Sequence, residues 1–447
     1  MELRRLNVIV GPNNSGKSSL IAAFRLVCQT LDSYDDQVAL LLNGPFGDFG
    51  TFKDIVYKNH RGKPLEISFD VEIPSINPPE PQRSLASFHL VFKYSQEDRE
   101  IYAQDVEIRL DGDHVISLRY SKEGRRHNVE RLGRSEIPSS LKNMISREFR
   151  VRHFFPVPMS QRLGAFERDR AGPYREFIEK INSGPDQDVL RKLTRIWSRV
   201  TGLISKTDYL GPLRTAPART YLFTGERSRR IGIGGENLTS LLATRDRKRT
   251  RDRDEEGRSL LLQDRLNEWL QKAEMARKAS LAPISDRHFE IRIQNFFTKE
   301  DQNIADVGFG HSQVLPFLVG GYALGPNSAY FAEQPELHLH PKAQAELGDY
   351  LLELYEQRTQ VLIETHSEHL ILRLQQHIAS GSIDCGDVRI FYVCNESSSA
   401  DGASAADKDE ITVLDLDKKG QFKTPWPRGF FPEKLEESRR LAKIRMT

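Results

Sequence analysis

The sequence has 447 residues, of which 38% are hydrophobic and 29% charged, enough for roughly one large domain or two to three ordinary ones. Lysines and arginines number 65 against 63 aspartates and glutamates. The net charge of +2 argues against a strongly basic protein dedicated to nucleic acid, although it is compatible with a local basic patch. Three scattered cysteines exclude a disulfide framework or a zinc ribbon, and no apolar run is long enough to span a bilayer. We therefore expect a cytoplasmic protein without a membrane partner.

The N-terminus carries the strongest motif of the chain. Residues 6–10 predict a short buried strand, and Ser18 to about Leu31 predict the helix that follows it. The segment between them fits G-x-x-x-x-G-K-[ST], a phosphate-binding loop that predicts binding of ATP or GTP with Mg²⁺. In such a loop the glycines let backbone amides curl around the phosphates, Lys17 reaches the β- and γ-phosphates, and the Ser18 hydroxyl coordinates the metal. The nucleotide-binding candidates are Gly11, Pro12, Asn13, Asn14, Ser15, Gly16, Lys17, Ser18 and Ser19.

Residues 50–125 favour an antiparallel β region appended to this loop. Apolar residues alternate along 65–73, which is typical of a half-buried strand. More β-rich sequence follows at 87–94 and 103–120, with a hairpin turn at Asp111-Gly112-Asp113.

The middle of the chain reads as mainly helical. Apolar residues recur at helical spacing from about 138 to 206, and YLGPLR at 209–214 interrupts this pattern with a Gly-Pro turn. Residues 244–258 are charged almost throughout and predict a solvated excursion. Residues 259–275 predict an amphipathic helix, whose apolar face consists of Leu262, Leu266, Trp269 and Leu270.

The last third of the chain returns to α/β sequence. Strands at 328–333 and 359–365 alternate with helices at about 341–356 and from 367, as in a parallel sheet. Residues 395–407 predict a loop, and 426–431 (WPRGFF) a turn before a charged tail helix.

A phosphate-binding loop needs a carboxylate from a neighbouring strand to hold Mg²⁺. The apolar strand that ends at Glu333 supplies one, so Ser18 and Glu333 are the predicted metal ligands. The alternative is a buried strand with an incidental capping acid. The strand that ends near His366 offers a histidine that can contact a γ-phosphate, although a lone histidine is more often structural.

A second anion site is predicted at residues 308–313 (GFGHSQ), a small-residue turn that opens an apolar helix. Its candidate ligand-binding residues are Gly308, Gly310, Ser312 and Gln313.

The order of these motifs resembles the ABC ATPase family, in the branch that includes SMC proteins, RecF and OLD-like AAA-family ATPases. GFGHSQ stands where the ABC signature would be, FAEQPELHLHP is similar to the Walker B strand and D-loop, and ETHS to the switch-histidine loop. The resemblance implies an α/β P-loop NTPase fold, an ABC-type ATPase head with an antiparallel β-subdomain and a helical insertion. It also implies a homodimer, or a higher even oligomer, in which the signature of one subunit closes on the ATP of the other.

More narrowly, NNSGKSS, EQPELHLHP and ETHSEHLILRL are similar to the stand-alone ATPases of bacterial anti-phage systems such as Septu. This resemblance implies control of a partner effector, expected to be a separate nuclease because the sequence shows no nuclease motif. The alternative is a RecF-like DNA-binding ATPase of repair or recombination, to which the basic stretches at 125–127, 147–152, 227–230 and 245–253 give weak support. A membrane-transporter ATPase fits poorly.

The sequence departs from the ABC pattern in two places. Gln334 follows the Walker B acid where ABC enzymes usually have a glutamate, and an amide cannot take a proton from water. Glu336 is the expected substitute and His366 a further contributor, so hydrolysis is expected to be slow. Only about five residues precede the first strand, where relatives have an extra strand.

The predicted domain organisation splits the ATPase head between the two ends of the chain. Residues 1–135 are expected to form its N-terminal half with the β-subdomain, 136–285 a mainly helical insertion, and 286–447 its C-terminal half.

Overall fold

The computed structural model describes residues 1–56, 62–74, 83–160, 173–184, 186, 188–245, 261–395 and 409–424. The chain forms two compact units: unit 1 contains residues 1–22 and 206–447, and unit 2 contains residues 23–205. Helix α1 (Lys17–Leu31) begins in unit 1 and continues into unit 2. The predictions made for 395–407, for 426–431 with the tail helix, and for most of the charged stretch at 244–258 lie outside the described residues.

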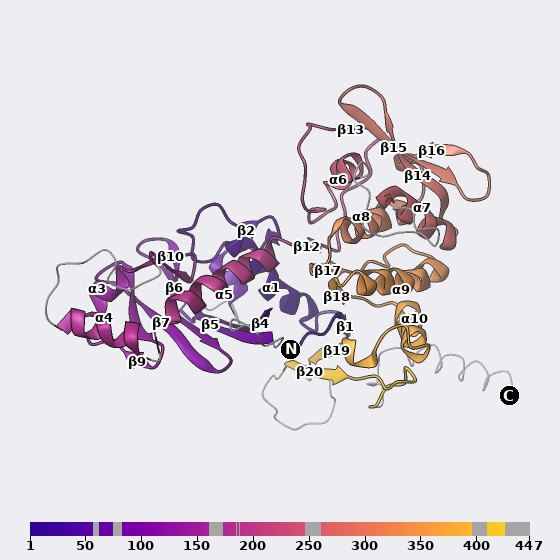
Figure 1. Cartoon of the computed structure of the whole chain (residues 1–447). Helices are drawn as coiled ribbons and strands as arrows, with labels where there is room; N and C mark the ends of the chain where they lie inside the picture. The colour runs from indigo at the N-terminus through magenta and orange to yellow at the C-terminus, as the bar shows by residue number, and fades with distance from the viewer. Residues whose placement is uncertain are drawn as a thin grey trace. The chain divides into compact units, whose positions relative to one another are not determined.

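A six-stranded sheet forms the centre of unit 1 (Figure 1). Five strands run parallel and the sixth is antiparallel. The first strand of the chain lies inside the sheet and is buried along its whole length, as expected for an apolar parallel strand covered on both faces. In spatial order the strands are β12 (Thr207–Leu210), β17 (Ala329–Glu333), β18 (Gln360–Glu364), β1 (Leu6–Val10), β19 (Val388–Asn395) and β20 (Asp409–Leu414).

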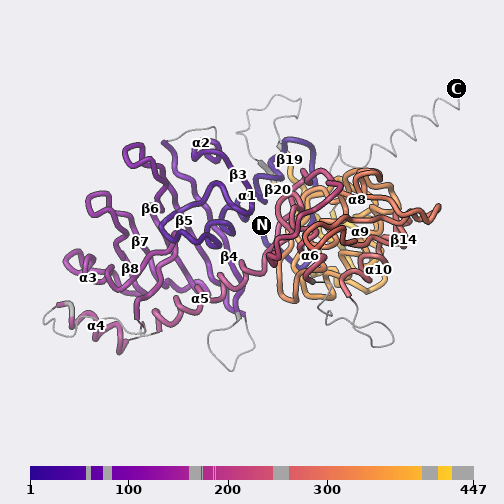
Figure 2. Tube along the Cα trace, turned by 90° about the horizontal axis from the view of Figure 1, so that it is seen from above, coloured from indigo at the N-terminus to yellow at the C-terminus, as the bar shows by residue number. Residues whose placement is uncertain are grey.

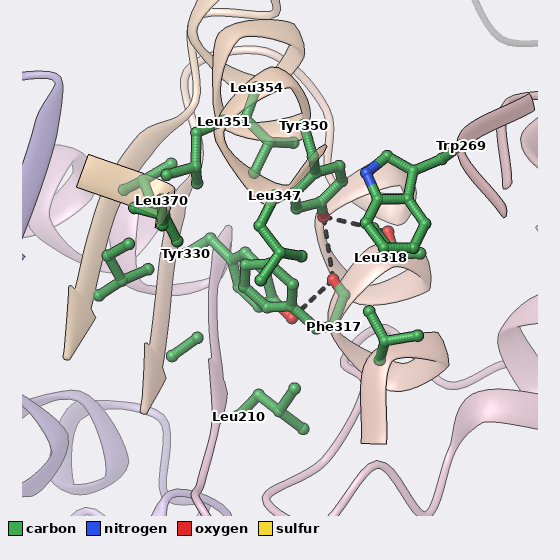
Figure 3. Packing of buried hydrophobic residues seen from close by; sticks show 14 of the residues in the cluster. Leu210, Trp269, Phe317, Leu318, Tyr330, Leu347, Tyr350, Leu351, Leu354 and Leu370 are labelled. Atoms are coloured by element: carbon green, nitrogen blue, oxygen red, sulfur yellow. Dashed lines mark hydrogen bonds between the residues drawn. The ribbon is translucent and has the colours of Figure 1, made fainter. Parts of the chain in front are cut away.

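Helix α8 (Phe309–Ala323) is the core helix of unit 1, and every residue from 314 to 323 is buried. A helix that is apolar on all sides is stable only when other elements surround it. The hydroxyls of Tyr330 in β17 and Tyr350 in the next helix both donate to the carbonyl of Phe317, at 3.0 and 2.9 Å (Figure 3). These two bonds attach α8 to the sheet on one side and to a neighbouring helix on the other.

The helices that follow the two acidic strands start at capping residues. Helix α9 (Pro341–Glu356) has proline at its first position, and α10 (Glu368–Ala379) begins after Ser367, whose hydroxyl accepts the Leu370 amide at 3.2 Å. The strands and helices predicted in this part of the chain are confirmed to within one or two residues. The amphipathic helix is confirmed as α7 (Leu262–Lys272), which buries the four predicted apolar residues.

The rest of the described part of unit 1 contains a second, smaller sheet, one short α-helix and two 3-10 helices, at Ile304–Asp306 and Cys385–Asp387. The sheet has the order β13 (Tyr221–Leu222), β15 (His288–Asn295) and β14 (Ala276–Pro283), with β16 (Asp301–Asn303) paired to β15. The helix is α6 (Leu238–Arg245).

Unit 2 is built on a six-stranded antiparallel sheet, with α5 (Val189–Ile204) packed against it (Figure 2). The predicted alternation along 65–73 is confirmed, since Ile67 and Ile73 are buried and the acidic side chains between them are exposed. The hairpin at 111–112 is also confirmed, with φ of 52° at Asp111 and 84° at Gly112. The strands are β4 (Leu65–Pro74), β5 (Arg83–Ser95), β6 (Glu100–Leu110), β7 (Asp113–Ser121), β8 (Arg126–Leu132) and β9 (Ser135–Glu136).

Unit 2 also contains several shorter elements. They are β2 (Asn43–Gly44), β3 (Gly47–Asp48), α2 (Phe52–Ile55), α3 (Lys142–Ser146), β10 (Phe149–Arg152), β11 (Phe155–Pro158) and α4 (Pro173–Ser183).

The two units divide the chain after residues 22 and 205, whereas the sequence suggested boundaries after 135 and 285. The middle of the chain also contains strands where helix was expected. Residues 149–158, expected to be helical, form the hairpin β10–β11, and β12 joins the sheet of unit 1 at the segment predicted as a Gly-Pro turn. Both segments are strands because they pair with another strand. The spacing of apolar residues along one segment gives no information about such pairing. No helix within the described ranges is both long and apolar enough to cross a membrane.

Candidate functional site

The predicted phosphate-binding loop lies where the central strand β1 ends. Strands β1, β18 and β17 are adjacent and parallel, so the residues that follow them meet at one edge of the sheet. The loop at 11–16 follows β1, Glu364 ends β18, and Glu333 ends β17. The β17–β18 register places Glu333 directly beside Glu364.

The loop needs glycine at its first position. Gly11 has φ of 150°, and a Cβ there would lie 2.1 Å from the carbonyl oxygen of Val393. Asn14 and Gly16 also have positive φ, at 61° and 90°. These conformations turn the chain sharply between β1 and α1, which is the geometry that directs successive backbone amides toward an anion.

The loop lysine and serine both contact the acid at the end of β18. The Lys17 ammonium donates to the carbonyls of Gly11 and Pro12, at 3.1 and 2.7 Å, and lies 3.7 Å from a carboxylate oxygen of Glu364. The Ser18 hydroxyl donates to the other Glu364 oxygen at 3.1 Å. The side chains of Lys17 and Glu364 are only 5% exposed, so this ion pair is buried.

Burial and neighbouring charges both shift the pKa values of Glu364 and Lys17. Burial raises the pKa of Glu364 and the adjacent Glu333 raises it further, whereas Lys17 and the Ser18 hydroxyl lower it. Burial lowers the pKa of Lys17, and Glu364 opposes that shift. The site therefore concentrates negative charge that a single ammonium only partly balances.

The Walker B candidate Glu333 is held from the other side. It is 4% exposed, and the phenol of Tyr209 in β12 donates to its Oε1 at 2.6 Å. Glu333 thus lies between a strand that carries a phenol and a strand that carries a second carboxylate.

The candidates for contact with the attacking water follow the same strands. Gln334 has φ of 47°, an uncommon conformation for a residue other than glycine, and its backbone N–H donates to the Glu364 backbone carbonyl at 2.7 Å. Glu336 is buried, and its Oε1 accepts the backbone amide of His366 at 2.6 Å. Burial raises the pKa of Glu336 and lowers the pKa of His366. The structure therefore brings the Glu336 carboxylate to the backbone amide of His366, and the shared role of the two side chains stays a prediction.

The signature candidates at 308–313 have other surroundings. Gly308 caps the N-terminus of α8, and a Cβ on Gly310 would lie 3.0 Å from the His338 carbonyl oxygen. The Ser312 hydroxyl donates to the carbonyl of Phe309, and the rings of Phe309 and His338 are 6.2 Å apart. Among the described residues, none of the hydrogen bonds or ring contacts of this segment reaches the phosphate-binding loop of the same chain.

The YLGPLR segment, predicted only as a turn, belongs to the site. Besides Tyr209 it contributes Arg214, whose Nη1 donates to the Pro212 carbonyl at 2.9 Å. Burial lowers the pKa of Arg214, while nearby Glu336 and Glu333 oppose that shift. Its Nε and Nη2 are buried without an acceptor among the residues that the structure describes. A buried cation thus adds to the charge balance of the site.

Sequence reasoning also passed over Glu364. Its strand, VLIE, has the same form as YFAE: an apolar run that ends in an acid. That repeated pattern was a usable signal for Glu364. The role of Tyr209 had no comparable signal, because it depends on the pairing of β12 with β17.

The oxygen donors at this edge fit a magnesium ion. Ser18, Glu333 and Glu364 offer one hydroxyl and two carboxylates, and Mg²⁺ typically takes one or two protein carboxylates together with water and phosphate oxygens. Two buried carboxylates side by side repel each other, and a divalent cation would offset that repulsion together with Lys17 and Arg214. Within the described ranges, no cluster of three or more His, Cys, Asp or Glu could hold a metal by itself. An ion at this edge would therefore also need the Ser18 hydroxyl and oxygens from water and phosphate.

Solved structures with a similar course of the chain include several SMC heads. One is an SMC head bound to the C-winged helix domain of ScpA, with 11% identity over 92% of this chain and 91% of that chain and a TM-score of 0.34. Another is the SMC head domain from Thermotoga maritima, with 12% identity over 92% and 90% and a TM-score of 0.33. At such identities and with TM-scores below 0.5, these likenesses carry no weight for function.

No curated protein matches the sequence. A family match covers most of the chain: residues 6–373 fit the family described as "AAA domain, putative AbiEii toxin, Type IV TA system". The matched region includes the phosphate-binding loop, both strand-end glutamates and His366. The chain therefore belongs to this AAA-domain family, as an ATP-binding P-loop ATPase.

Proposed function

We propose that this chain is a slow, Mg²⁺-dependent ATPase that dimerises around ATP and controls a separate effector, a nuclease, in anti-phage defence. The observation that carries the enzymatic part is the meeting of Lys17, Ser18, Glu333 and Glu364 at one sheet edge. The family description, which refers to a Type IV TA system, supports a role beside a partner protein.

Each residue has a defined task in this proposal. The loop amides and Lys17 bind the phosphates of ATP, and Ser18 with Glu333 and Glu364 would hold Mg²⁺. The metal would neutralise charge on the phosphate oxygens. Glu336 and His366 orient the attacking water, and Glu336 takes its proton. Gln334 can orient water but cannot accept a proton, so its position beside the acid accounts for slow turnover.

The dimer in this proposal depends on the start of α8. The N-terminus of a helix carries partial positive charge and free amides, which suit a phosphate. Among the described residues, 308–313 have no hydrogen bond or ring contact to their own phosphate-binding loop, and Phe309 within this segment is 68% exposed. We assign this segment to the ATP that is bound by a second copy of the chain.

Sedimentation velocity and phosphate release together test the proposal. With ATP and Mg²⁺ the wild type is expected to double in mass and turn over slowly, whereas Lys17→Ala stays monomeric and inactive. Lys342→Ala is the matched control, since it removes a lysine whose partner Glu274 is half exposed. A wild type that hydrolyses ATP but stays monomeric would contradict the shared site.

The separate effector is tested with DNA. Purified chain is incubated with supercoiled and linear plasmid in the presence of ATP and Mg²⁺. Intact DNA is expected, because the nuclease is assigned to another protein. Cleavage that is lost in Lys17→Ala would instead place the nuclease in this chain.

The RecF-like alternative has less support from the basic stretches. Arg125 pairs with Asp98 at 3.3 Å, Arg150 pairs with Asp36 at 2.7 Å, and Arg230 donates to the Thr207 carbonyl. Arginines that are engaged by carboxylates of their own unit contribute less to phosphate binding. DNA affinity that falls steeply with salt in the absence of any partner would favour this alternative.

A further inference from the structure

Arg214 belongs to a short segment that follows the edge strand β12 and is hydrogen-bonded on both sides. Strand β12 is parallel to β17, so the residues that follow it lie at the same sheet edge as Glu333. The amides of Gly211 and Thr215 donate to two successive carbonyls of the loop at 233–234, each at 2.8 Å. Because the backbone is held on both sides, a change of position at Arg214 is a change of its side chain.

Two donors of the Arg214 guanidinium meet no acceptor. Nη1 donates to the Pro212 carbonyl at 2.9 Å, whereas Nε and Nη2 are buried without a hydrogen-bond acceptor in the described part of the chain. Nε and Nη2 direct two parallel N–H groups from one edge of the guanidinium plane, and such an edge binds an oxyanion through two bonds. A guanidinium keeps its charge when it is buried, and a buried charge without a partner costs free energy. These two donors therefore suit an anion that comes to the site.

Two carboxylates near Arg214 do not serve as that anion. Burial lowers the pKa of Arg214, whereas the charges of Glu336 and Glu333 raise it. Glu336 accepts the backbone amide of His366, and Glu333 accepts the phenol of Tyr209, each at 2.6 Å. Neither acid accepts a hydrogen bond from Nε or Nη2. Their charge thus favours a cation at this edge, while the Nε–Nη2 edge stays available to an oxyanion.

We propose that Arg214 is a catalytic residue that turns its Nε–Nη2 edge onto the γ-phosphate of the ATP bound by the same chain. This inference rests on the proposed ATPase function. A P-loop lysine reaches the β- and γ-phosphates, so the terminal phosphate belongs where Lys17 meets Glu364, and Glu333 is the next acid along that edge. Nε and Nη2 are closed to solvent in this structure, so the side chain must turn to reach a phosphate. Turning breaks at most the one bond of Nη1 and gives two buried donors an acceptor.

The role assigned to Arg214 is electrostatic. As water attacks, its oxygen bonds to the γ-phosphorus, the bond from that phosphorus to the bridging oxygen breaks with its electron pair left on ADP, and the water proton passes to Glu336. Negative charge spreads over the three oxygens of the transferred group, and a guanidinium stabilises that charge without losing a proton. ADP lacks the group that Arg214 contacts. Arg214 should therefore distinguish ATP from ADP as well as speed hydrolysis.

The test compares two arginines of the same segment. Arg214→Gln removes the paired donors and Arg214→Lys keeps only the charge. Arg219→Gln is the matched control, since both terminal nitrogens of Arg219 already donate to Asp306, at 2.9 and 2.6 Å. Calorimetry measures the affinities for ADP and for the non-hydrolysable imido analogue of ATP. Phosphate release from ATP is followed separately, and thermal unfolding is recorded without nucleotide.

For Arg214→Gln we expect the affinity for the analogue to fall about 10- to 100-fold, as for the loss of two charge-assisted hydrogen bonds, and the affinity for ADP to change less than about twofold. Phosphate release should fall at least about a hundredfold. Arg214→Lys should lie between this variant and the wild type, because an ammonium cannot offer the paired donors. Arg219→Gln should match the wild type in all three measurements.

The unfolding temperature separates this role from a structural one. Because Nε and Nη2 bond to no described residue, Arg214→Gln should not lower it. A lower unfolding temperature with equal losses of analogue and ADP affinity in both Arg214 variants would overturn the catalytic role, and so would an unchanged ratio of the two affinities. A wild type that binds neither nucleotide would contradict the proposed ATPase function itself, and the role of Arg214 with it.

Discussion

The buried pair between Lys17 and Glu364 allows a quantitative prediction. Its charged atoms are 3.7 Å apart, and both side chains are 5% exposed. At an effective dielectric constant near 20 the gross attraction is about 4 kcal/mol. Lys17 also bonds to two backbone carbonyls, which compensate part of the loss when the carboxylate is removed. We expect a coupling free energy of about 2–3 kcal/mol between the two side chains.

A double-mutant cycle isolates that coupling. Lys17→Met, Glu364→Gln and the double variant are unfolded by calorimetry without nucleotide, and the transition of unit 1 is analysed separately because two-state behaviour holds only unit by unit. Each single variant leaves one buried charge without its partner, which lowers the free energy of unfolding. The cycle separates the coupling between the two side chains from the other effects of each substitution.

The surface pair Lys342–Glu274, with side chains 44% and 48% exposed, provides the control cycle. Exposed pairs contribute about 0–1 kcal/mol. If the coupling of the buried pair is no larger than that of this surface pair, the argument from burial is refuted.

Three further predictions concern the site and its core. Gln334→Glu should raise phosphate release at least about tenfold, because a carboxylate can take a proton from water, and an unchanged rate would remove Gln334 as the cause of slow turnover. Burial raises the pKa of Asp208 to about 7, although the amides of Ile231 and Tyr209 and the charge of Arg230 lower it. Asp208 therefore holds a proton more tightly in the folded protein than in the unfolded chain. Its contribution to stability is full below pH 4 and is lost as pH rises through about 7, so wild type should lose about 3–4 kcal/mol over that range, and Asp208→Asn should not. Thermal unfolding at pH 5 and pH 8, an interval that covers about 2–3 kcal/mol of that loss, checks this. Gly321→Ala should cost about 2–3 kcal/mol in urea unfolding, since its Cβ would lie 2.0 Å from the Tyr350 hydroxyl, whereas Gly325→Ala has open space and should be near neutral.

The sequence predicted the elements whose pattern is local. The phosphate-binding loop, the apolar strands ending at 333 and 364 and the helices after them were predicted almost to the residue, because each combines an apolar run with a clear start or stop signal. The strand β12 was missed, since four residues beside a Gly-Pro turn carry no periodicity. Its place follows only from pairing with β17, far along the chain.

The same distinction applies to the candidate site. Lys17, Ser18 and Glu333 lie in motifs with known spacing, and the structure places them at one edge. Glu364 and Tyr209 reach the site only because their strands lie beside β1 and β17. No local sequence pattern predicts that order of strands. The predicted partner role of residues 308–313 stays a prediction.

The central position of β1 has a consequence for synthesis. It precedes its sheet neighbours by a long stretch of chain: Asn7 bonds to the Val361 carbonyl across a sequence separation of 354 residues. At roughly 5–20 residues per second, a ribosome needs about 20–70 s to make that stretch. Residues 23–205 can fold during this interval, while the apolar strand has no sheet to enter. We therefore expect that a nascent chain without β18, which pairs with β1 and carries Glu364, does not hold nucleotide.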